Sequence, residues 1–292
     1  MSGALLAAAA GVGFGVFQAT NARALRGGDD PWASTLVQVS IAAVALAIVC
    51  ALSGDLAGVG DAPLWALGDF ALAGLIHFFA GWSLLNLSQQ RIGAARTSPL
   101  LTTVPVFGVV VAFLTVGQKP TAVALGAIAL MCLGAYVVAS RGGHERPRAA
   151  DALPGLGCAL MWAVSPVFTV HGLRGFDSAL VGITLGLLIS VAVFVPCYLL
   201  VRGSTVARDA LAGATGPLKL FAGVLVGLST WWRWAALEDA SVGVVLALAL
   251  LSVPVVLFLA PVIAGRHREH VTGALWAGAS LVVSGALILV VA

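Results

Sequence analysis

One short segment of the sequence concentrates side chains that could bind a small anionic molecule. Arg233 lies in the segment Ser229-Thr-Trp-Trp-Arg-Trp-Ala-Ala-Leu-Glu238, within a mainly apolar stretch. Its guanidinium can bind a carboxylate or a phosphate through two parallel hydrogen bonds. Trp231, Trp234 and Glu238 follow the spacing i, i+3 and i+7, so they share one face of a helix. The segment predicts a binding site with a cation, aromatic walls and a carboxylate. The alternative is an arginine that snorkels from an interfacial tryptophan belt.

The third predicted helix contains His77 and a second set of candidate side chains. Histidine titrates near neutral pH, which makes His77 a candidate for proton exchange. A hydrogen bond to a neighbouring helix, or a lining position without titration, would also explain this residue. Trp82, Asn86 and Gln89 form a stripe at i, i+4 and i+7 on another helix face. The predicted binding residues are therefore Trp82, Asn86, Trp231, Arg233, Trp234 and Glu238.

The composition indicates that lipid is the solvent for most of the protein surface. Of the 292 residues, 60% are hydrophobic and only 9% are charged, whereas a soluble domain carries roughly 25% charged residues. The net charge of +3 is too small and too dispersed to indicate a nucleic-acid partner. All four cysteines lie in apolar stretches without metal-ligand spacing, so neither disulfides nor a metal site is predicted. The expected partner of the chain is a lipid bilayer.

Apolar stretches of about 20 residues, the length of a helix that spans a bilayer, recur along the chain with short polar breaks. The alternation of short strands that is typical of an outer-membrane barrel is not present in the sequence. We therefore predict an all-α polytopic membrane protein of about ten transmembrane helices. The predicted helices cover residues 2–22, 31–53, 64–87, 92–116, 121–140, 152–170, 178–201, 217–237, 241–264 and 271–292.

The sequence also predicts an internal repeat. The longest hydrophilic break, residues 141–148, lies at the midpoint of the chain. Five helices per half is an odd number, so the second half enters the membrane from the opposite side. We predict one five-helix repeat over residues 1–140, a linker over 141–150 and a second, inverted five-helix repeat over 151–292. The two halves align at a nearly constant offset of 148 to 149 residues, which pairs Phe14 with Trp162, Trp82 with Trp231, Gln89 with Glu238 and Pro105 with Pro254.

The positive charges are distributed unevenly between alternate breaks. The breaks after the first, third, fifth, seventh and ninth predicted helices hold twelve lysines and arginines, whereas the alternate breaks hold two. Loops rich in lysine and arginine face the cytoplasm. Both termini are therefore predicted to lie outside the cell, and the linker in the cytoplasm, for a chain in the cytoplasmic membrane.

Several segments resemble the drug/metabolite transporter superfamily, in its EamA-like branch, over the whole chain as two copies. The resemblance implies two bundles around a central cavity, lined by the first, third, fourth, sixth, eighth and ninth helices. Gln118 departs from the glutamate that the family usually has in that turn, and termini outside differ from many relatives. The segments are Trp162-Ala-Val-Ser-Pro166 and its counterpart Phe14-Gly-Val-Phe17, Ala94 to Phe107 and its counterpart Val244 to Val256, and the turns Val116-Gly-Gln-Lys119 and Arg268-Glu-His270.

These features together predict a secondary transporter or exchanger of a small organic metabolite, such as an amino acid, that works by alternating access. The alternative is a non-transporting scaffold or a regulatory subunit of a partner complex. The sequence contains no P-loop and no nucleophile–base pair, so neither a cofactor nor enzymatic activity is predicted. Helices rich in glycine and alanine suit either internal packing or a homodimer.

Overall fold

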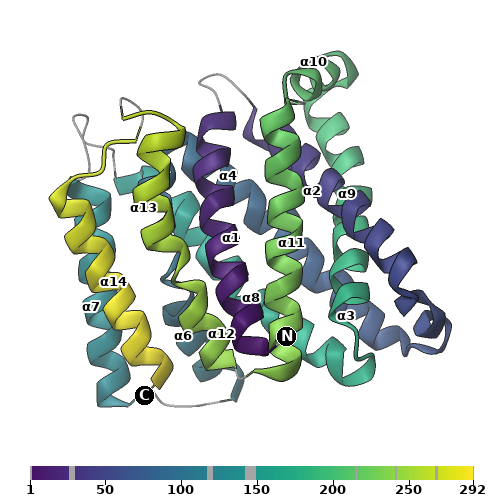
Figure 1. Cartoon of the computed structure of the whole chain (residues 1–292), viewed down its shortest axis with the longest axis horizontal. Coiled ribbons are helices and arrows are strands. Elements are labelled where there is room, and N and C mark those ends of the chain that lie inside the picture. The colour runs from purple at the N-terminus through teal and green to yellow at the C-terminus, as the bar shows by residue number, and fades with distance from the viewer. Residues whose placement is uncertain are drawn as a thin grey trace.

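The computed structural model describes residues 2–25, 30–116, 121–141, 149–214, 216–240, 242–266 and 269–291. These residues are almost entirely helical and include no strand. Most helices run side by side between two ends of the molecule, and the short α10 lies above one end (Figure 1). The α-helices are α1 Gly3–Ala24, α2 Pro31–Ser53, α3 Leu64–Gly74, α4 Trp82–Ile92, α5 Ala94–Leu101, α6 Val104–Val116, α7 Ala122–Arg141, α8 Leu153–Gly175, α9 Ala179–Arg202, α10 Ser204–Ala214, α11 Pro217–Asp239, α12 Val242–Ala249, α13 Ser252–Ile263 and α14 Gly273–Val291.

Apolar helices occupy every segment that the sequence predicts to cross the membrane. Within the described residues, seven helical stretches are long and apolar enough to span a bilayer, and three shorter apolar helices lie in α7, α13 and α14. The predicted class, an all-α polytopic membrane protein, is confirmed. The count of ten spans stays a prediction, because the apolar stretches described in α7, α13 and α14 are shorter than the other seven.

Two of the predicted helices are broken near their middle, at equivalent places in the two halves. One break separates α5 from α6, and the other separates α12 from α13. Each break comes just before a proline, Pro105 or Pro254. A proline lacks the backbone N–H, and its ring clashes with the carbonyl four residues earlier. The hydroxyls of Thr102 and Thr103 donate to backbone carbonyls of α5 at 2.7 Å, which stabilises the first break.

Two local features differ from the sequence prediction. The turn between the third and fourth spans lies at Gly93, just after the predicted break, because this glycine adopts the left-handed φ of 78° that other residues disfavour. Residues 202–216, predicted as a polar break, include the helix α10. Ala210 and Leu211 of this helix pack beside the buried Phe194 and Tyr198 of α9. Arg208 and Asp209 of the same helix are exposed, so these neighbouring residues lie on a different face from Ala210 and Leu211.

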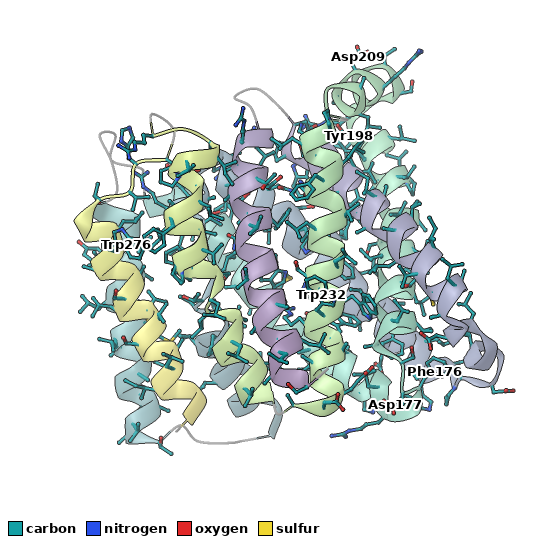
Figure 2. The ribbon with its side chains drawn as sticks, viewed as in Figure 1. Phe176, Asp177, Tyr198, Asp209, Trp232 and Trp276 are labelled. Atoms are coloured by element: carbon teal, nitrogen blue, oxygen red, sulfur yellow. The ribbon has the colours of Figure 1, made fainter. Side chains whose placement is uncertain are left out.

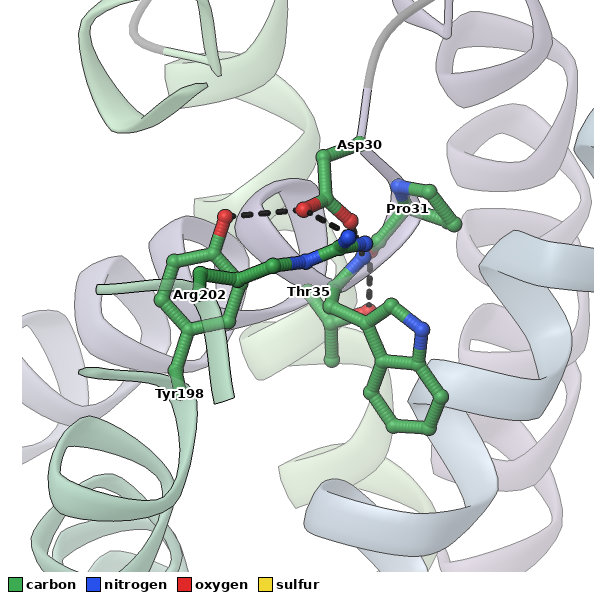
Figure 3. Close-up of polar contacts among 6 residues, drawn as sticks. Asp30, Pro31, Thr35, Tyr198 and Arg202 are labelled. Atoms are coloured by element: carbon green, nitrogen blue, oxygen red, sulfur yellow. Dashed lines mark hydrogen bonds and ion pairs between the residues drawn. The ribbon is translucent and has the colours of Figure 1, made fainter. Parts of the chain in front are cut away.

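One end of the bundle gathers the loops that are predicted to be cytoplasmic. Asp177 and Asp209 mark the two opposite ends (Figure 2). At the end with Asp209, Asp30 caps the start of α2 and pairs with Arg202 of α9 at 3.1 Å (Figure 3). Tyr198 donates to the same carboxylate at 2.9 Å. The predicted linker residues 142–148 lie outside the described residues, and the inside–outside orientation stays a prediction.

The packing of the helices is symmetric under exchange of the two predicted halves. α1 packs against α11, α12 and α13, and its counterpart α8 packs against α3, α4, α5 and α6. α2 contacts α11 as its counterpart α9 contacts α3, and α7 packs along α14. Between α7 and α14, Gly134 and Gly278 allow an approach that leaves no room for a Cβ atom. These pairings support the predicted repeats over 1–140 and 151–292, which stay a prediction.

Apolar side chains are found both in the core and on the outer faces. The largest fully buried side chains include Phe17, Phe70, Phe78 and Trp82, from α1, α3, the segment after α3 and α4. On the outside, leucines such as Leu200 are more than 80% exposed. Exposing these apolar side chains to water would cost free energy, whereas the hydrocarbon of a bilayer solvates them.

Candidate functional site

A central cavity lies where α1, α8 and α11 meet the two broken helices. Its lining comes from both halves of the chain, and its volume is about 100 Å³. Ala10 and Phe14 of α1 lie on its wall, and Leu237 lies near the end of α11. The cavity therefore belongs to the half of the bundle away from the end that holds Asp30 and Arg202. Polar or aromatic groups on its wall are Phe14, His77, Thr102, Trp162, Thr169, Ser229, Thr230, Arg233, Trp234 and Ser252.

Arg233 places a cation in this cavity. It lies in α11, six residues before the helix ends at Asp239. Its guanidinium carbon lies 5.8 Å from the ring centroid of Trp162, a cation–π arrangement. One guanidinium nitrogen lies 3.5 Å from Nε2 of His77. None of the ion pairs among the described residues includes Arg233. The guanidinium therefore retains donors that a bound anion could occupy.

His77 is held in a short π-helical segment, Leu75–Gly81, between α3 and α4. Its Nδ1 lies 2.9 Å from the hydroxyl of Ser165, and its ring stacks on Trp162 at 5.2 Å with an angle of 12°. Because a guanidinium only donates, Nε2 is the acceptor toward Arg233 and Nδ1 carries the proton toward Ser165. The geometry fits a neutral imidazole at this position.

Trp162 is the common contact of the site. Its ring stacks on the ring of His77 and contacts the guanidinium of Arg233. It also packs edge-on against the ring of Phe14, with 5.2 Å between the centroids. Its indole N–H donates to the backbone carbonyl of His77 at 3.4 Å. Phe14 and Trp162 are counterparts in the predicted repeat, and their contact places them where the two halves meet.

Of the predicted residues, the structure brings Arg233, Trp234 and His77 together on the cavity wall. The other four predicted binding residues do not line this cavity. Trp82 is buried against Phe17 and Phe78, and Trp231 packs at the edge of the same core. Their contact with a substrate stays a prediction.

Glu238, also predicted to bind substrate, caps the start of helix α9 in this structure. Its Oε1 accepts a hydrogen bond from the backbone N–H of Ala179 at 2.9 Å. Ala179 is the first residue of α9, where N–H groups lack partners within the helix. A carboxylate at that place stabilises the helix terminus, and Glu238 does not line the cavity in this structure.

Asn86, the last of the predicted binding residues, belongs to a buried amide cluster, here Asn21, Gln38, Asn86 and Gln89. Asn21 donates to Asn86 and to Gln89 at 2.6 Å, and Gln38 donates to Asn21 at 2.5 Å. Asn86 donates to Gln38 at 3.0 Å. All four side chains are at most 4% exposed. The amide cluster joins α1, α2 and α4 between the central cavity and the end that holds Asp30.

Sequence reasoning did not select Phe14, Trp162, Ser165 and Thr230 as site residues. Phe14 and Trp162 were identified only as counterparts in the repeat and as part of the family resemblance. Their pairing was available from the sequence, because equivalent residues of an inverted repeat contact each other where they lie close to its symmetry axis. Ser165 lies one turn along α8 from Trp162 and gave no separate signal.

The fold and the cavity define a polytopic membrane protein whose polar site lies between two groups of helices. The family model of the EamA-like transporter family matches residues 1–140. A probable terminal-alkyne amino-acid exporter of Streptantibioticus cattleyicolor is 34% identical over 112 residues, which make up 38% of this chain and 36% of that protein. The resemblance to the EamA-like transporter family is therefore confirmed through the first half of the chain.

A solved crystal structure of a protein resembles the whole chain. It has a TM-score of 0.62, 18% sequence identity and coverage of 98% of this chain and 96% of that one. At this identity the likeness concerns the fold alone. The likeness in fold covers both halves of the chain.

Proposed function

We propose that the chain is a secondary transporter that moves a small organic metabolite with a carboxylate, such as an amino acid, across the cytoplasmic membrane. The observation that carries this proposal is Arg233, a cation in the central cavity that none of the ion pairs among the described residues includes. A substrate carboxylate is the partner that a guanidinium binds through two parallel hydrogen bonds.

The energetics favour a functional arginine over an anchoring one. A charged side chain at bilayer depth costs several kcal/mol unless it is hydrated or paired, and such residues face cavities or partners. Arg233 contacts Trp162 and approaches His77 from a cavity wall, so it does not extend toward the lipid interface. A bound carboxylate would offset part of the desolvation, and Phe14, Trp162 and Trp234 would enclose the rest of the substrate.

Alternating access is supported by the position of the cavity and of the amide cluster. The cavity wall includes Ala10 and Leu237, toward the end of the bundle that is predicted to lie outside. The amide cluster joins α1, α2 and α4 on the other side of the cavity. We infer a state that is closed toward the cytoplasm, and rocking of the two halves about the cavity would open the opposite side.

The relative in Streptantibioticus cattleyicolor supports the substrate class. It is described as a probable exporter of a terminal-alkyne amino acid, and an amino acid carries the carboxylate that Arg233 would bind. The similarity covers about a third of that protein, so it favours amino-acid-like substrates without selecting one. The non-transporting scaffold predicted as the alternative has no comparable support.

The test is efflux of a pooled metabolite extract from proteoliposomes, read by mass spectrometry. The samples are wild type, Arg233→Ala and the control Arg208→Ala, which removes an exposed arginine of α10. We expect selective loss of a few carboxylates with wild type and the control, and none with Arg233→Ala. Selective loss that survives in Arg233→Ala would leave a transporter whose arginine serves another role. No loss above empty liposomes from folded protein would favour the scaffold.

A further inference from the structure

A second cavity continues from the central one along α8. It has a volume of about 700 Å³ and shares Val104, Pro105, Trp162 and Pro166 with the central cavity. From there it follows α8 to Arg174, with α6 as its other wall. Twelve residues of helix separate Trp162 from Arg174, which corresponds to roughly 18 Å at about 1.5 Å per residue. The two cavities form one continuous path. The second cavity, outside the central one, is called the α6–α8 groove.

The α6–α8 groove is apolar over most of its length. Its walls include Ala163, Val167, Phe168 and Val170 of α8. Val167 is 50% exposed on the outside of the bundle, so the groove borders the region that lipid solvates. Its polar residues are confined to the far end, where His171 pairs with Asp69 and Arg174 lies one turn further on.

The sizes of the two cavities indicate how a substrate would be divided between them. Ligand pockets commonly enclose roughly 300–1,000 Å³, whereas the central cavity holds about 100 Å³. That volume suits a small charged head group beside Arg233. Any longer substituent has to continue into the α6–α8 groove, because that cavity adjoins the site directly.

We propose that the α6–α8 groove holds the apolar tail of the substrate while Arg233 binds its carboxylate. The substrate class is then an amphiphilic carboxylate with an unbranched apolar chain, such as an amino acid with a long alkyl side chain. This inference rests on the proposed transport function. An apolar chain gains affinity as each methylene leaves water, by up to roughly fourfold per methylene when burial is complete.

Gly108 provides a way to block the groove without crowding the fold. It lies on the groove wall, and a Cβ atom at this position meets no heavy atom within 4 Å. Gly126 of α7 is equally open, and it lines neither cavity. Gly108→Leu therefore fills the groove, and Gly126→Leu is its matched control.

The experiment measures counterflow of four amino acids with unbranched side chains of increasing length in proteoliposomes, corrected for empty liposomes. The compounds are aminobutyrate, norvaline, norleucine and aminooctanoate, each with its amino group on the α-carbon. We expect the wild-type KM to fall with each methylene. Gly108→Leu should raise KM about tenfold for aminooctanoate and less than twofold for aminobutyrate, whereas Gly126→Leu should match wild type.

Two results would overturn the groove assignment alone. One is a wild-type KM that does not vary with chain length. The other is a Gly108→Leu variant that slows transport of all four compounds equally, as expected if a lipid acyl chain fills the groove. Counterflow of none of the four, together with no efflux of any metabolite above empty liposomes from folded wild type, would overturn the proposed function and the groove with it.

Discussion

Arg233 lies against a tryptophan face and a histidine nitrogen at a depth where a cation is costly. A desolvated cation–π contact contributes about 2 kcal/mol or more, which is less than the cost of a charge inside a bilayer. The contact with Trp162 therefore positions the guanidinium, and the carboxylate proposed to bind there would supply further compensation. The neutral His77 accepts from Arg233 without competing for that anion.

Replacing Trp162 should weaken substrate binding through Arg233. In Trp162→Leu the guanidinium loses its aromatic face, and we expect an increase in KM of about twofold to about thirtyfold, the range that corresponds to a cation–π contact. Trp162→Phe keeps an aromatic face and should recover most of the affinity. Trp276→Leu, in α14 and outside both cavities, is the control and should stay within about twofold of wild type. Unchanged KM in Trp162→Leu would contradict this role.

His77→Gln tests whether a proton takes part in transport. A carboxylate that engages Arg233 would free Nε2 of His77 to accept a proton, so flux should depend on pH with a midpoint that histidine sets. Glutamine keeps a polar side chain that does not titrate. We expect its pH profile of counterflow to lose or shift that midpoint. The same profile in wild type and His77→Gln would remove the proton role and leave His77 as a lining residue.

At the residue scale, the sequence predicted which side chains carry polar chemistry better than it predicted the residues that they contact. Arg233, His77 and Trp234 were predictable because ionisable or amphipathic side chains in an apolar helix need a polar environment. Glu238 and Asn86 were predicted by the same reasoning; they contact Ala179 and the amide cluster, and their contact with a substrate stays a prediction. Both are satisfied polar groups, and the identity of a partner on another helix is not contained in the spacing along one helix.

Broken and irregular helices frame the site at the scale of elements. The breaks before Pro105 and Pro254 lie at equivalent places in the two halves, and residues on both sides of each break line the cavity. The π-helical segment Leu75–Gly81 inserts an extra residue into its turn, as such segments often do at functional sites. The prolines were visible in the sequence. The π-helical turn had no sequence signal, and it changes which face His77 shares with the residues of α4.

Glu269 connects the turn before α14 to the start of α5 and makes stability depend on pH. It accepts from the backbone N–H groups of Ala94 and Ala95 at 2.8 and 3.0 Å. Burial raises the pKa of Glu269 above its ordinary value, against these bonds and the Arg96 guanidinium. A carboxyl with a pKa higher in the folded than in the unfolded state stabilises most at low pH, and this contribution declines as pH rises through the folded pKa.

The melting temperature of Glu269→Gln should therefore vary less with pH. We expect wild type in detergent to lose more stability than the variant between about pH 4.5, near the unfolded value, and about pH 7. Thermal unfolding followed by intrinsic fluorescence measures both slopes, and Asp177→Asn, an exposed carboxylate, is the control. Equal slopes for wild type and Glu269→Gln would show that this carboxyl does not titrate within the range.

In the whole molecule, the helices of the two halves pack in equivalent pairs. The sequence predicted its class and the places of its apolar helices, because length and hydropathy are local properties. Which helices meet around the cavity depends on contacts between distant segments, such as α1 with α11 and α3 with α8. Only the repeat alignment gave access to those contacts, through the pairing of Phe14 with Trp162.

Labelling of single cysteines tests the predicted orientation of the molecule. Asp177 and Asp209 lie at opposite ends of the bundle (Figure 2) and are both exposed, apart from any span interior. In a background with the native cysteines replaced by alanine, a membrane-impermeant maleimide should label Asp177→Cys in intact cells. Asp209→Cys should react only after permeabilisation, because the positive loops near it face the cytoplasm. The reverse pattern would place both termini inside.

The central claim is that Arg233 binds the carboxylate of the transported molecule. The most direct measurement compares counterflow of norleucine with that of its carboxamide, norleucinamide, in proteoliposomes of wild type and Arg233→Gln. A charged hydrogen bond contributes about 1.5–3 kcal/mol, so wild type should prefer the carboxylate about tenfold or more, and Arg233→Gln should lose that preference. An equal preference for norleucine in both proteins would contradict the claim.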